Sequence, residues 1–349
     1  MNNFFDLRFE DLEDELHGLS QPGFRAKQIW EGIYQQLLSS WQDFTNLPKD
    51  LCTFLEGRYS LESLNVLDET TALDQQSTKY LFTLADDNFV ESVILRNNDR
   101  ITLCVSTQSG CPVGCVFCAT GNFGYYRDLT SGEIVEQVIL LSRLLNKEDE
   151  HITNIVLMGM GEPFLNYDAT LEAIKRFNDN SGMNIGARRI TISTIGIPDK
   201  ILRFAQEGLQ VNLAVSLHAP NDELRRKLVP LAAKIKITDL MEVCRQYIKI
   251  TNRRVTFEYV LIKGINDQPQ QAEQLAALLN GMLCHVNLIG LNPTVHYPGQ
   301  PPSNQAMNAF GHILLSHRIP TSVRNSQGSD IQAACGQLAG KVRKPNKVK

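Results

Sequence analysis

The alternation of two hydrophobic patterns between residues 101 and 291 constrains the fold of this chain more than any other feature. Short apolar runs alternate about six times with stretches whose apolar residues recur at helical spacing. Strands and helices in alternation are joined by right-handed crossovers, which build a parallel sheet with helices outside. We therefore predict an α/β fold and prefer a partial (β/α)6 barrel to a flat doubly wound sheet. The predicted strands are 101–106, 152–158, 189–193, 211–217, 255–261 and 285–291, and the predicted helices are 131–145, 169–178, 222–228, 238–250 and 271–279.

The segments on either side of this array have other patterns. Near the N-terminus, apolar residues around Trp30 recur at helical spacing, which predicts a helical accessory region. Further along, two β-type runs flank the turn residues Asp86, Asp87 and Asn88, which predicts a hairpin. The predicted division is a helical region at 1–78, a β-hairpin linker at 79–98, the barrel at 99–318, a C-terminal segment at 319–338 and a basic, disordered tail at 339–349.

Composition limits the cellular context. The net charge of −4 does not by itself indicate a nucleic-acid binder, although local basic patches could serve that purpose. No run approaches the ~20 apolar residues of a membrane helix, and the acidic N-terminus does not resemble a secretory signal. We expect a cytoplasmic protein without membrane contact, in which the eight cysteines are thiols or ligands and not a disulfide framework.

Three of these cysteines, Cys111, Cys115 and Cys118, lie in the stretch CPVGCVFC directly after the first predicted core strand. A structural zinc ion takes four protein ligands, and no second CxxC or HxxxH pattern supplies the fourth. An iron–sulfur cluster held by three thiolates instead leaves one iron open for a substrate or cofactor. The spacing C-x3-C-x2-C resembles the motif of the radical S-adenosylmethionine (SAM) superfamily. That resemblance implies a [4Fe–4S] cluster whose open iron is chelated by SAM.

The ends of the later core strands are the predicted SAM site, because parallel strands bring their carboxyl ends to one rim. The run MGMGEP after the second strand resembles the Gly-Glu element of the superfamily, with Glu162 placed to accept hydrogen bonds from the SAM ammonium. A plain turn is the alternative for this run, and a structural hydrogen bond is the alternative for His218. The predicted SAM contacts are Gly161, Glu162, Ser193, Ser216, Leu217, His218 and Asn292.

Two further cysteines have surroundings that indicate a chemical role. We interpret the other three, Cys52, Cys244 and Cys284, as small buried hydrophobic residues. Cys335 lies between Ala334 and Gly336, which leave its sulfur accessible, and Cys104 lies on the strand that leads to the cysteine motif. In a reducing compartment such a pair indicates nucleophilic or redox chemistry.

Taken with these cysteines, nearly the whole chain resembles the RlmN/Cfr family of RNA adenine methyltransferases. The matching strings include FRAKQIWEGIY, LCVSTQSGCPVGCVFCATG, MGMGEPFLNY, LAVSLHAPNDELRRKLVP and GSDIQAACGQLAG. The longer strings favour the RlmN branch, which methylates carbon 2 of an adenosine in 23S rRNA and, in many members, of one in a tRNA anticodon loop. Methylation of carbon 8 of the same rRNA adenosine, as in the Cfr branch, is the alternative.

The resemblance also implies roles for single residues. One SAM methylates Cys335, and a second SAM at the cluster gives a radical that takes hydrogen from this methyl group. The resulting radical adds to adenine, and Cys104 then attacks the sulfur of Cys335 to form a transient disulfide and release the base. Glu91 matches the general base that removes the ring proton, although an exposed strand carboxylate is the alternative for this residue.

The expected partners follow from this chemistry. The target adenine must be unstacked to reach the site, and Lys27, Arg127, Arg188, Arg189 and the basic tail are candidate phosphate contacts. We expect an electron donor such as flavodoxin or ferredoxin, and a monomer. Two other interpretations remain, namely a methylthiolating radical SAM enzyme and a zinc-stabilised RNA-binding module without catalysis.

Overall fold

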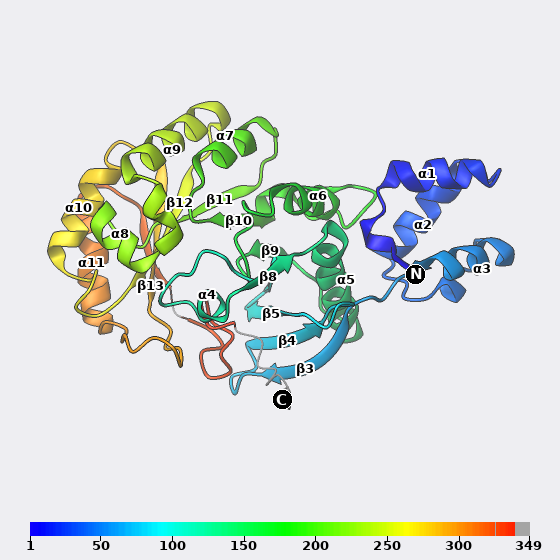
Figure 1. The fold of residues 1–349 in the computed structure, drawn as a ribbon, viewed down its shortest axis with the longest axis horizontal. Helices are drawn as coiled ribbons and strands as arrows, with labels where there is room; N and C mark the ends of the chain where they lie inside the picture. The colour runs from blue at the N-terminus through cyan, green and yellow to red at the C-terminus, as the bar shows by residue number, and fades with distance from the viewer. Residues whose placement is uncertain (325, 339–349) are drawn as a thin grey trace, which may run out of the picture.

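The computed structural model describes residues 1–324 and 326–338. Ten strands form one mixed sheet (Figure 1). Because β14 and β3 are its two edges, the sheet is an open, partial barrel. In spatial order the strands are β14 (Thr321–Arg324), β13 (Cys284–Gly290), β12 (Val255–Leu261), β11 (Asn212–Ser216), β10 (Ile190–Thr194), β9 (Asn154–Leu157), β6 (Arg100–Cys104), β5 (Phe89–Asn97), β4 (Ser77–Thr83) and β3 (Asn65–Thr71).

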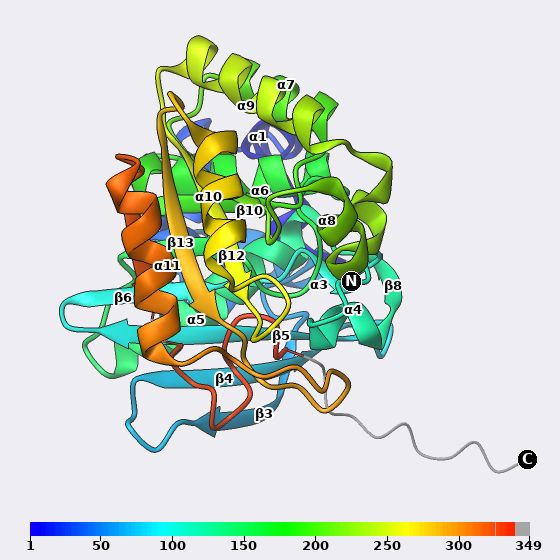
Figure 2. The same ribbon diagram turned by 90° about the vertical axis from the view of Figure 1, so that its left-hand side faces the viewer.

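The strands from β14 to β6 are parallel, which confirms the six predicted core strands and the α/β fold class. Helices connect them, and Figure 2 shows two of these, α10 and α11, side by side along β12 and β13. The five predicted helices are present, and α7 and α11 are additional. The helices of the array are α5 (Ser131–Lys147), α6 (Tyr167–Asn178), α7 (Pro198–Gln206), α8 (Asp222–Leu228), α9 (Ile237–Thr251), α10 (Pro269–Leu279) and α11 (Asn304–Ser316).

The antiparallel part of the sheet differs from the predicted linker. The hairpin of β4 and β5 forms around the expected turn, but β5 also pairs with β6 and β4 also pairs with β3. The hairpin therefore extends the barrel sheet and does not merely connect two domains. The strand β3 lies within the region predicted as helical, because its residues complete the edge of this sheet.

The N-terminal helices α1 (Phe9–Gly18), α2 (Phe24–Tyr34) and α3 (Lys49–Arg58) form a separate lobe at the right of Figure 1. Phe4 lies at its centre, with its ring centroid 5.6 Å from that of Trp41 and 6.1 Å from that of Trp30. The indole of Trp30 donates to Asp179 at 3.1 Å, and Asn3 donates to Glu136 at 2.9 Å. Polar contacts thus join the lobe to the outer helices of the barrel.

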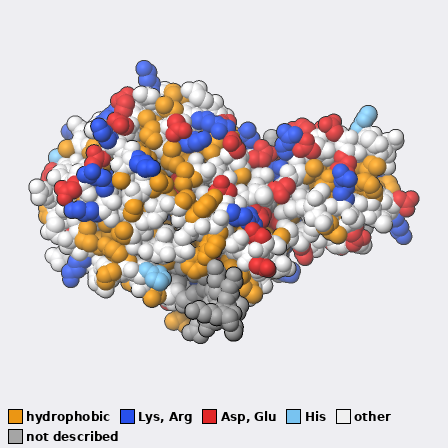
Figure 3. Space-filling view, viewed as in Figure 1, with side chains coloured by type: hydrophobic (Ala, Val, Ile, Leu, Met, Phe, Trp, Pro, Cys, Tyr) orange, Lys and Arg blue, Asp and Glu red, His pale blue; other side chains and the backbone are white. Residues whose placement is uncertain are grey.

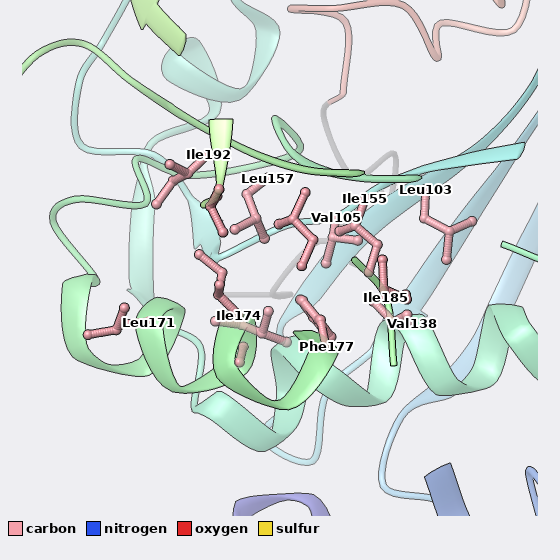
Figure 4. Close-up of a cluster of buried hydrophobic side chains, with 14 of the residues drawn as sticks. Leu103, Val105, Val138, Ile155, Leu157, Leu171, Ile174, Phe177, Ile185 and Ile192 are labelled. Atoms are coloured by element: carbon pink, nitrogen blue, oxygen red, sulfur yellow. The ribbon is translucent and has the colours of Figure 1, made fainter. Parts of the chain in front are cut away.

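The main core lies between the parallel strands and the helices that cover them. Leu103 of β6, Ile155 of β9 and Ile192 of β10 pack against Val138 of α5 and Phe177 of α6 (Figure 4). All five side chains are buried. Burial of this face leaves the other face of the same strands, and their carboxyl ends, to form the site.

In the part of the chain that the structure describes, no helix is long and apolar enough to cross a membrane. The basic tail predicted at 339–349 lies outside the described residues.

Candidate active site

The three motif cysteines lie in a compact loop that follows β6. The loop begins with β7 (Gln108–Gly110) and ends with α4 (Ala119–Phe123) and β8 (Tyr125–Asp128). The amide of Cys111 donates to the carbonyl of Gly124 at 2.8 Å, and the amide of Cys118 donates to that of Cys115 at 3.0 Å. A Cβ at Gly121 would lie 2.9 Å from the backbone nitrogen of Cys115, so only glycine lets the loop close this tightly.

The three thiols influence one another electrostatically. Burial, assisted by the nearby Cys118 and Glu162, raises the pKa of Cys111 to about 12. Burial also raises the pKa of Cys115 well above its usual value, again assisted by the other two thiols of the motif. Three neighbouring thiolates are therefore unfavourable unless a cationic centre neutralises them, which iron would do.

The three thiols could hold either a single metal ion or an iron–sulfur cluster. Among residues 1–324 and 326–338, no three Cys, His, Asp or Glu side chains are arranged to hold a single metal ion. A mononuclear zinc ion needs ligands that converge on one point. In a [4Fe–4S] cluster each thiolate binds a different iron atom, so the sulfurs stand further apart. Three thiol donors in one loop fit such a cluster.

Glu162 follows β9 beside this loop, and the chain itself engages its carboxylate. One oxygen accepts from the amide of Phe164 at 3.0 Å and the other from the amide of Ile195 at 2.8 Å. Burial raises the pKa of Glu162 to about 7, and hydrogen bonds to Thr194 and the two amides oppose this rise. The carboxylate is thus fixed in orientation, and its predicted contact with the SAM ammonium would use its remaining lone pairs.

Gly161 has a positive φ of 109°. A Cβ at this position would lie 2.8 Å from the backbone nitrogen of Gln108 and 2.8 Å from the hydroxyl oxygen of Thr107. The glycine therefore allows β9 to turn directly against the start of the cysteine loop.

Strands β10 and β11 bring Ser193 and Ser216 together, with 3.4 Å between their hydroxyl oxygens. Beyond Ser216, Leu217 is fully buried, and the ring of His218 meets the ring of Phe117 edge-on at 5.1 Å. Nδ1 of His218 accepts from the amide of Val260 at 3.1 Å. The predicted contacts on these strands thus share one rim with Phe117 of the cysteine motif.

His218 is buried, and this burial lowers its pKa to about 3, with a further contribution from the nearby Arg225. The imidazole is therefore neutral at pH 7. Because Nδ1 accepts a hydrogen bond, the proton lies on Nε2, which can donate to a ligand. His218 therefore makes the structural hydrogen bond of the alternative interpretation, and the predicted contact with SAM would use the proton on Nε2.

The C-terminal segment returns to this rim and is tied to the cysteine loop. The amide of Ala119 donates to the carbonyl of Gly336 at 2.7 Å, and the hydroxyl of Thr120 donates to that of Leu338 at 2.5 Å. The side chain of Asn292, at the end of β13, donates to the carbonyl of Cys335 at 3.0 Å. These bonds hold Cys335 beside the motif cysteines.

Cys335 and Cys104 are brought together, although they lie far apart in the sequence. Ala333 and Leu338 of the C-terminal segment pack with Cys104 and Met160 in one apolar cluster. Burial raises the pKa of Cys104, and proximity to Cys335 raises it further. Both residues are free thiols, Cys104 buried and Cys335 exposed to solvent.

The thiol of Cys335 has its own surroundings. Although the residue is accessible to water, protein atoms crowd its sulfur, and this desolvation raises its pKa. Glu258 raises that pKa further, whereas Arg324 lowers it. Cys335 is thus an accessible thiol that is mainly protonated until it reacts.

Glu91 is buried on β5, so the alternative of an exposed strand carboxylate is excluded. Its Oε1 lies 3.1 Å from Nζ of Lys79, and Nζ is also 3.5 Å from the carbonyl oxygen of Gln332. Lys79 therefore links Glu91 to the segment that carries Cys335.

Two residues of the site were not predicted. Lys79 lies diagonally across the hairpin from Glu91, since Lys79 pairs with Val93 and Glu91 with Leu81. Counting outward from the turn would have found this pair.

The other residue is Glu258, whose Oε1 accepts from Asn287 at 2.8 Å while its buried Oε2 has no hydrogen-bond partner among the described residues. A buried acid within an apolar strand is the signal that could have found it.

The candidate phosphate contacts are not brought together. Arg127 forms ion pairs with Asp86 and with Glu133, the latter at 2.7 Å, so its charge is already balanced. Lys27 lies in the N-terminal lobe, 3.6 Å from Glu31. Only Arg188 and Arg189 remain as neighbours without an ion pair in the described chain, away from this site.

Comparisons with known proteins agree with the geometry. Residues 105–276 match the model of the radical SAM superfamily, and residues 2–60 match that of the ribosomal RNA large subunit methyltransferase N-terminal domain. The chain is 48% identical to a radical SAM methyltransferase from Sphaerobacter thermophilus of known crystal structure. The match has a TM-score of 0.94 and covers 97% of this chain and 99% of that one.

Curated relatives named probable dual-specificity RNA methyltransferase RlmN are similarly close. The protein from Thermotoga sp. (strain RQ2) is 46% identical over 97% of both chains. The protein from Geobacillus kaustophilus (strain HTA426) is 45% identical over 98% of this chain and 93% of its own length. The cofactors that the three cysteines and the superfamily imply are a [4Fe–4S] cluster and SAM. The chain therefore belongs to the RlmN family of radical SAM RNA methyltransferases.

Proposed function

We propose that this chain methylates carbon 2 of an adenosine in 23S rRNA and of one in a tRNA anticodon loop. Two SAM molecules are used in each turnover, and Cys335 carries the methyl group. The observation that carries the proposal is the position of Cys335. Its carbonyl accepts from Asn292, the residues Gly336 and Leu338 that follow it are bonded to the cysteine loop, and its thiol lies near enough to Cys104 to raise the pKa of that thiol.

The roles of the cysteine loop and the strand ends follow from their chemistry. Cys111, Cys115 and Cys118 would hold the cluster, which supplies the electron that turns bound SAM into a source of hydrogen-abstracting radical. Gly161, Glu162, Ser193, Ser216, Leu217, His218 and Asn292 would bind and orient SAM. Neutral His218 offers a hydrogen-bond donor at this rim without adding a positive charge beside the cationic sulfonium of SAM.

Cys335 would first lose its proton, and its thiolate would accept the methyl group of one SAM, which leaves as S-adenosylhomocysteine. Its accessibility suits this step, because the sulfur must approach a methyl group in line. After the carbon of that group is joined to the adenine, Glu91 would take the proton from the ring carbon, and the unpaired electron of the adduct would leave to an electron acceptor such as the oxidised cluster. Lys79, 3.1 Å from Glu91, would hold the carboxylate in place.

Cys104 would complete the turnover. Its thiolate attacks the sulfur of Cys335, a sulfur–sulfur bond forms, and the bond between that sulfur and the transferred carbon breaks. The electron pair of the broken bond remains on the transferred carbon, which takes up a proton to complete the methyl group of the product, and a reductant later reopens the disulfide. The raised pKa of Cys104 keeps this thiol unreactive until its proton is removed.

The RNA would enter with its target adenine flipped out of the stack. We place the activity in the cytoplasm, where rRNA and tRNA are found. An electron donor of the flavodoxin or ferredoxin type and a monomeric state remain predictions.

The regiochemistry can be tested directly. Anaerobic protein with reconstituted iron and sulfide is incubated with SAM, reductant and either a 23S rRNA fragment or a tRNA transcript, and the RNA is digested to nucleosides for mass spectrometry. We expect 2-methyladenosine from both substrates. Methylation at carbon 8 would contradict the proposal and support the Cfr-type alternative.

The order of the cysteine steps gives a second test. Replacing Cys104 by alanine should leave RNA covalently attached to Cys335, because nothing resolves the bond between them. The adduct should be visible as a shifted band on a denaturing gel and located by peptide mass spectrometry.

Two variants make the control for this test. Cys52→Ala, at a half-buried cysteine of α3 in the N-terminal lobe, should turn over without a trapped adduct, and Cys104→Ala/Cys335→Ala should give none. Normal turnover of Cys104→Ala would show that Cys104 does not resolve the intermediate.

A further inference from the structure

A polar cleft lies at the amino ends of the central strands, opposite to the carboxyl ends that meet the cysteine loop. It has a volume of about 650 Å³ and is lined by residues from three separate segments. Arg100 begins β6, Thr153 and Asn154 lie at the start of β9, and Arg188 and Arg189 directly precede β10. These are the amino ends of neighbouring strands, whereas the methylation site lies at carboxyl ends.

The cleft carries an unbalanced positive charge. Its charged lining residues are Arg100, Arg188, Arg189 and one acid, Asp99. Within residues 1–324 and 326–338, none of these three guanidinium groups forms an ion pair. Arg96, only four residues before Arg100, is by contrast paired with both Glu148 and Glu150. Among the described residues, the chain therefore balances a nearby arginine but not those of the cleft.

The backbone that presents these arginines is fixed. The side chain of Asn154 donates to the carbonyl of Arg189 at 3.3 Å, and that of Asn212 donates to the carbonyl of Arg188 at 2.8 Å. Nε of Arg188 donates to Gln210 at 3.0 Å, which leaves its terminal amino groups for another partner. Because the main chain at these arginines is already fixed, less conformational entropy is lost when the guanidinium groups bind an anion.

We propose that this cleft binds backbone phosphates of the RNA substrate, as a second anchoring site distinct from the site of methylation. Guanidinium groups bind phosphate oxygens in pairs of parallel hydrogen bonds, which suits arginine better than lysine here. On the face shown in Figure 3, lysine and arginine side chains are interspersed with aspartate and glutamate. The cleft concentrates one sign of charge in a small volume.

The site would contact a nucleotide other than the target. The five residues of β10 separate its two ends by roughly 15 Å, at about 3.3 Å per residue. A phosphate held at Arg189 therefore belongs to RNA that passes around the sheet from the flipped adenosine. The inference rests on the proposed function for the identity of the nucleic acid, but its test is a binding measurement that needs neither cluster nor SAM.

The test compares charge removal inside and outside the cleft. Arg100→Gln/Arg189→Gln and the matched control Arg245→Gln/Lys249→Gln each remove two positive charges, and the control residues are exposed on the outer helix α9. Binding of a tRNA transcript is measured between 0.05 and 0.3 M salt. If each cleft arginine neutralises one phosphate, the log–log salt slope should fall by about 1.4–1.8 in the cleft variant. Affinity at about 0.1 M salt should then be roughly 25- to 60-fold weaker, whereas the control should keep the wild-type slope.

Two further variants guard against misfolding. Arg100→Lys/Arg189→Lys keeps the charge and should restore most of the slope. Asp99→Asn removes the one acid of the cleft and should tighten RNA binding a few-fold, which a damaged fold would not do.

Equal losses in the cleft and control variants would overturn the assignment, because the effect would then be general charge. An unchanged salt slope of RNA binding in the cleft variant would also overturn the assignment. If inorganic phosphate nevertheless stabilised the wild-type protein against heat, the cleft would be a site for free phosphate only. Methylation at carbon 8, with the cleft effect intact, would overturn the proposed regiochemistry but leave the cleft assignment standing.

Discussion

At Gly161 the backbone passes so close to Gln108 that no side chain fits. At Gly161 and at His218, the surroundings decide which residue or which protonation state fits. At His218, burial selects the neutral form of the imidazole, and a bond to the Val260 amide selects its tautomer. Both effects arise from neighbours on other strands, and both can be tested by substitution.

Gly161→Ala should lower the free energy of unfolding by about 1–3 kcal/mol, because the new Cβ meets the Gln108 backbone and φ is positive. Chemical denaturation measures this change, and SAM binding should weaken with it. The matched control is Gly186→Ala, where a Cβ meets nothing within 4 Å. Its effect should be within about 0.5 kcal/mol. Equal effects at both glycines would contradict the argument.

His218 should make stability depend on pH. Its pKa is about 3 in the folded protein and 6.5 as an ordinary value, so between these limits the unfolded chain binds a proton that the folded chain does not. The free energy of unfolding should therefore fall as pH decreases below 6.5, by up to about 1.4 kcal/mol per pH unit. Above pH 6.5 this contribution is fully present.

The measurement is denaturant unfolding of wild type and His218→Gln at pH 5 and pH 7. The difference between the two pH values should be smaller in the variant by the His218 contribution. His312→Gln, at an exposed position of α11, should leave the wild-type difference unchanged. An identical pH dependence in wild type and His218→Gln would show that this histidine does not titrate as its burial implies.

At the scale of elements, the C-terminal segment is held by a few hydrogen bonds and one small apolar cluster. Asn292 anchors the carbonyl of Cys335, and Gln337 donates to the carbonyl of Pro293 at 2.8 Å. Each such bond contributes about 1 kcal/mol, so removing one should alter the position of Cys335 without unfolding the barrel.

Asn292→Ala should increase the rate at which iodoacetamide alkylates Cys335 by about fivefold, because about 1 kcal/mol of tethering is lost. Peptide mass spectrometry separates Cys335 from the other thiols. Gln327→Ala is the control, since Gln327 lies earlier in the same segment and donates to Gln76 at 2.9 Å. An unchanged rate in Asn292→Ala, or the same increase in both variants, would show that Asn292 does not restrain Cys335.

For the whole molecule, the three motif thiols need a cationic centre to become thiolates together. Protein purified without oxygen should contain about four irons per chain and be brown. Cys118→Ser should lose most of this iron, whereas Cys52→Ser in the N-terminal lobe should keep it. Iron and zinc are measured by elemental analysis. Stoichiometric zinc in colourless protein would support the RNA-binding module and contradict the cluster.

Much of the architecture follows from local patterns. The predicted strand 255–261 coincides with β12, and the predicted helix 222–228 with α8, because both patterns depend on the periodicity of neighbouring residues. Two of the additional elements are short. Helix α7 has nine residues and begins with Pro198, and the edge strand β14 has four residues and none fully buried. Such elements are stabilised mainly by packing against the array.

By itself the sequence determined the parallel array and the cysteine loop at its rim, because hydrophobic period and motif spacing are properties of adjacent residues. Only the tertiary structure decided which distant residues meet. It placed Cys335 near Cys104, paired Glu91 with Lys79, and gathered Arg100 with Arg188 and Arg189 in a cleft. Each of these groupings depends on strand order and on the return of the chain's end across the sheet. Those are long-range contacts, which no local pattern records.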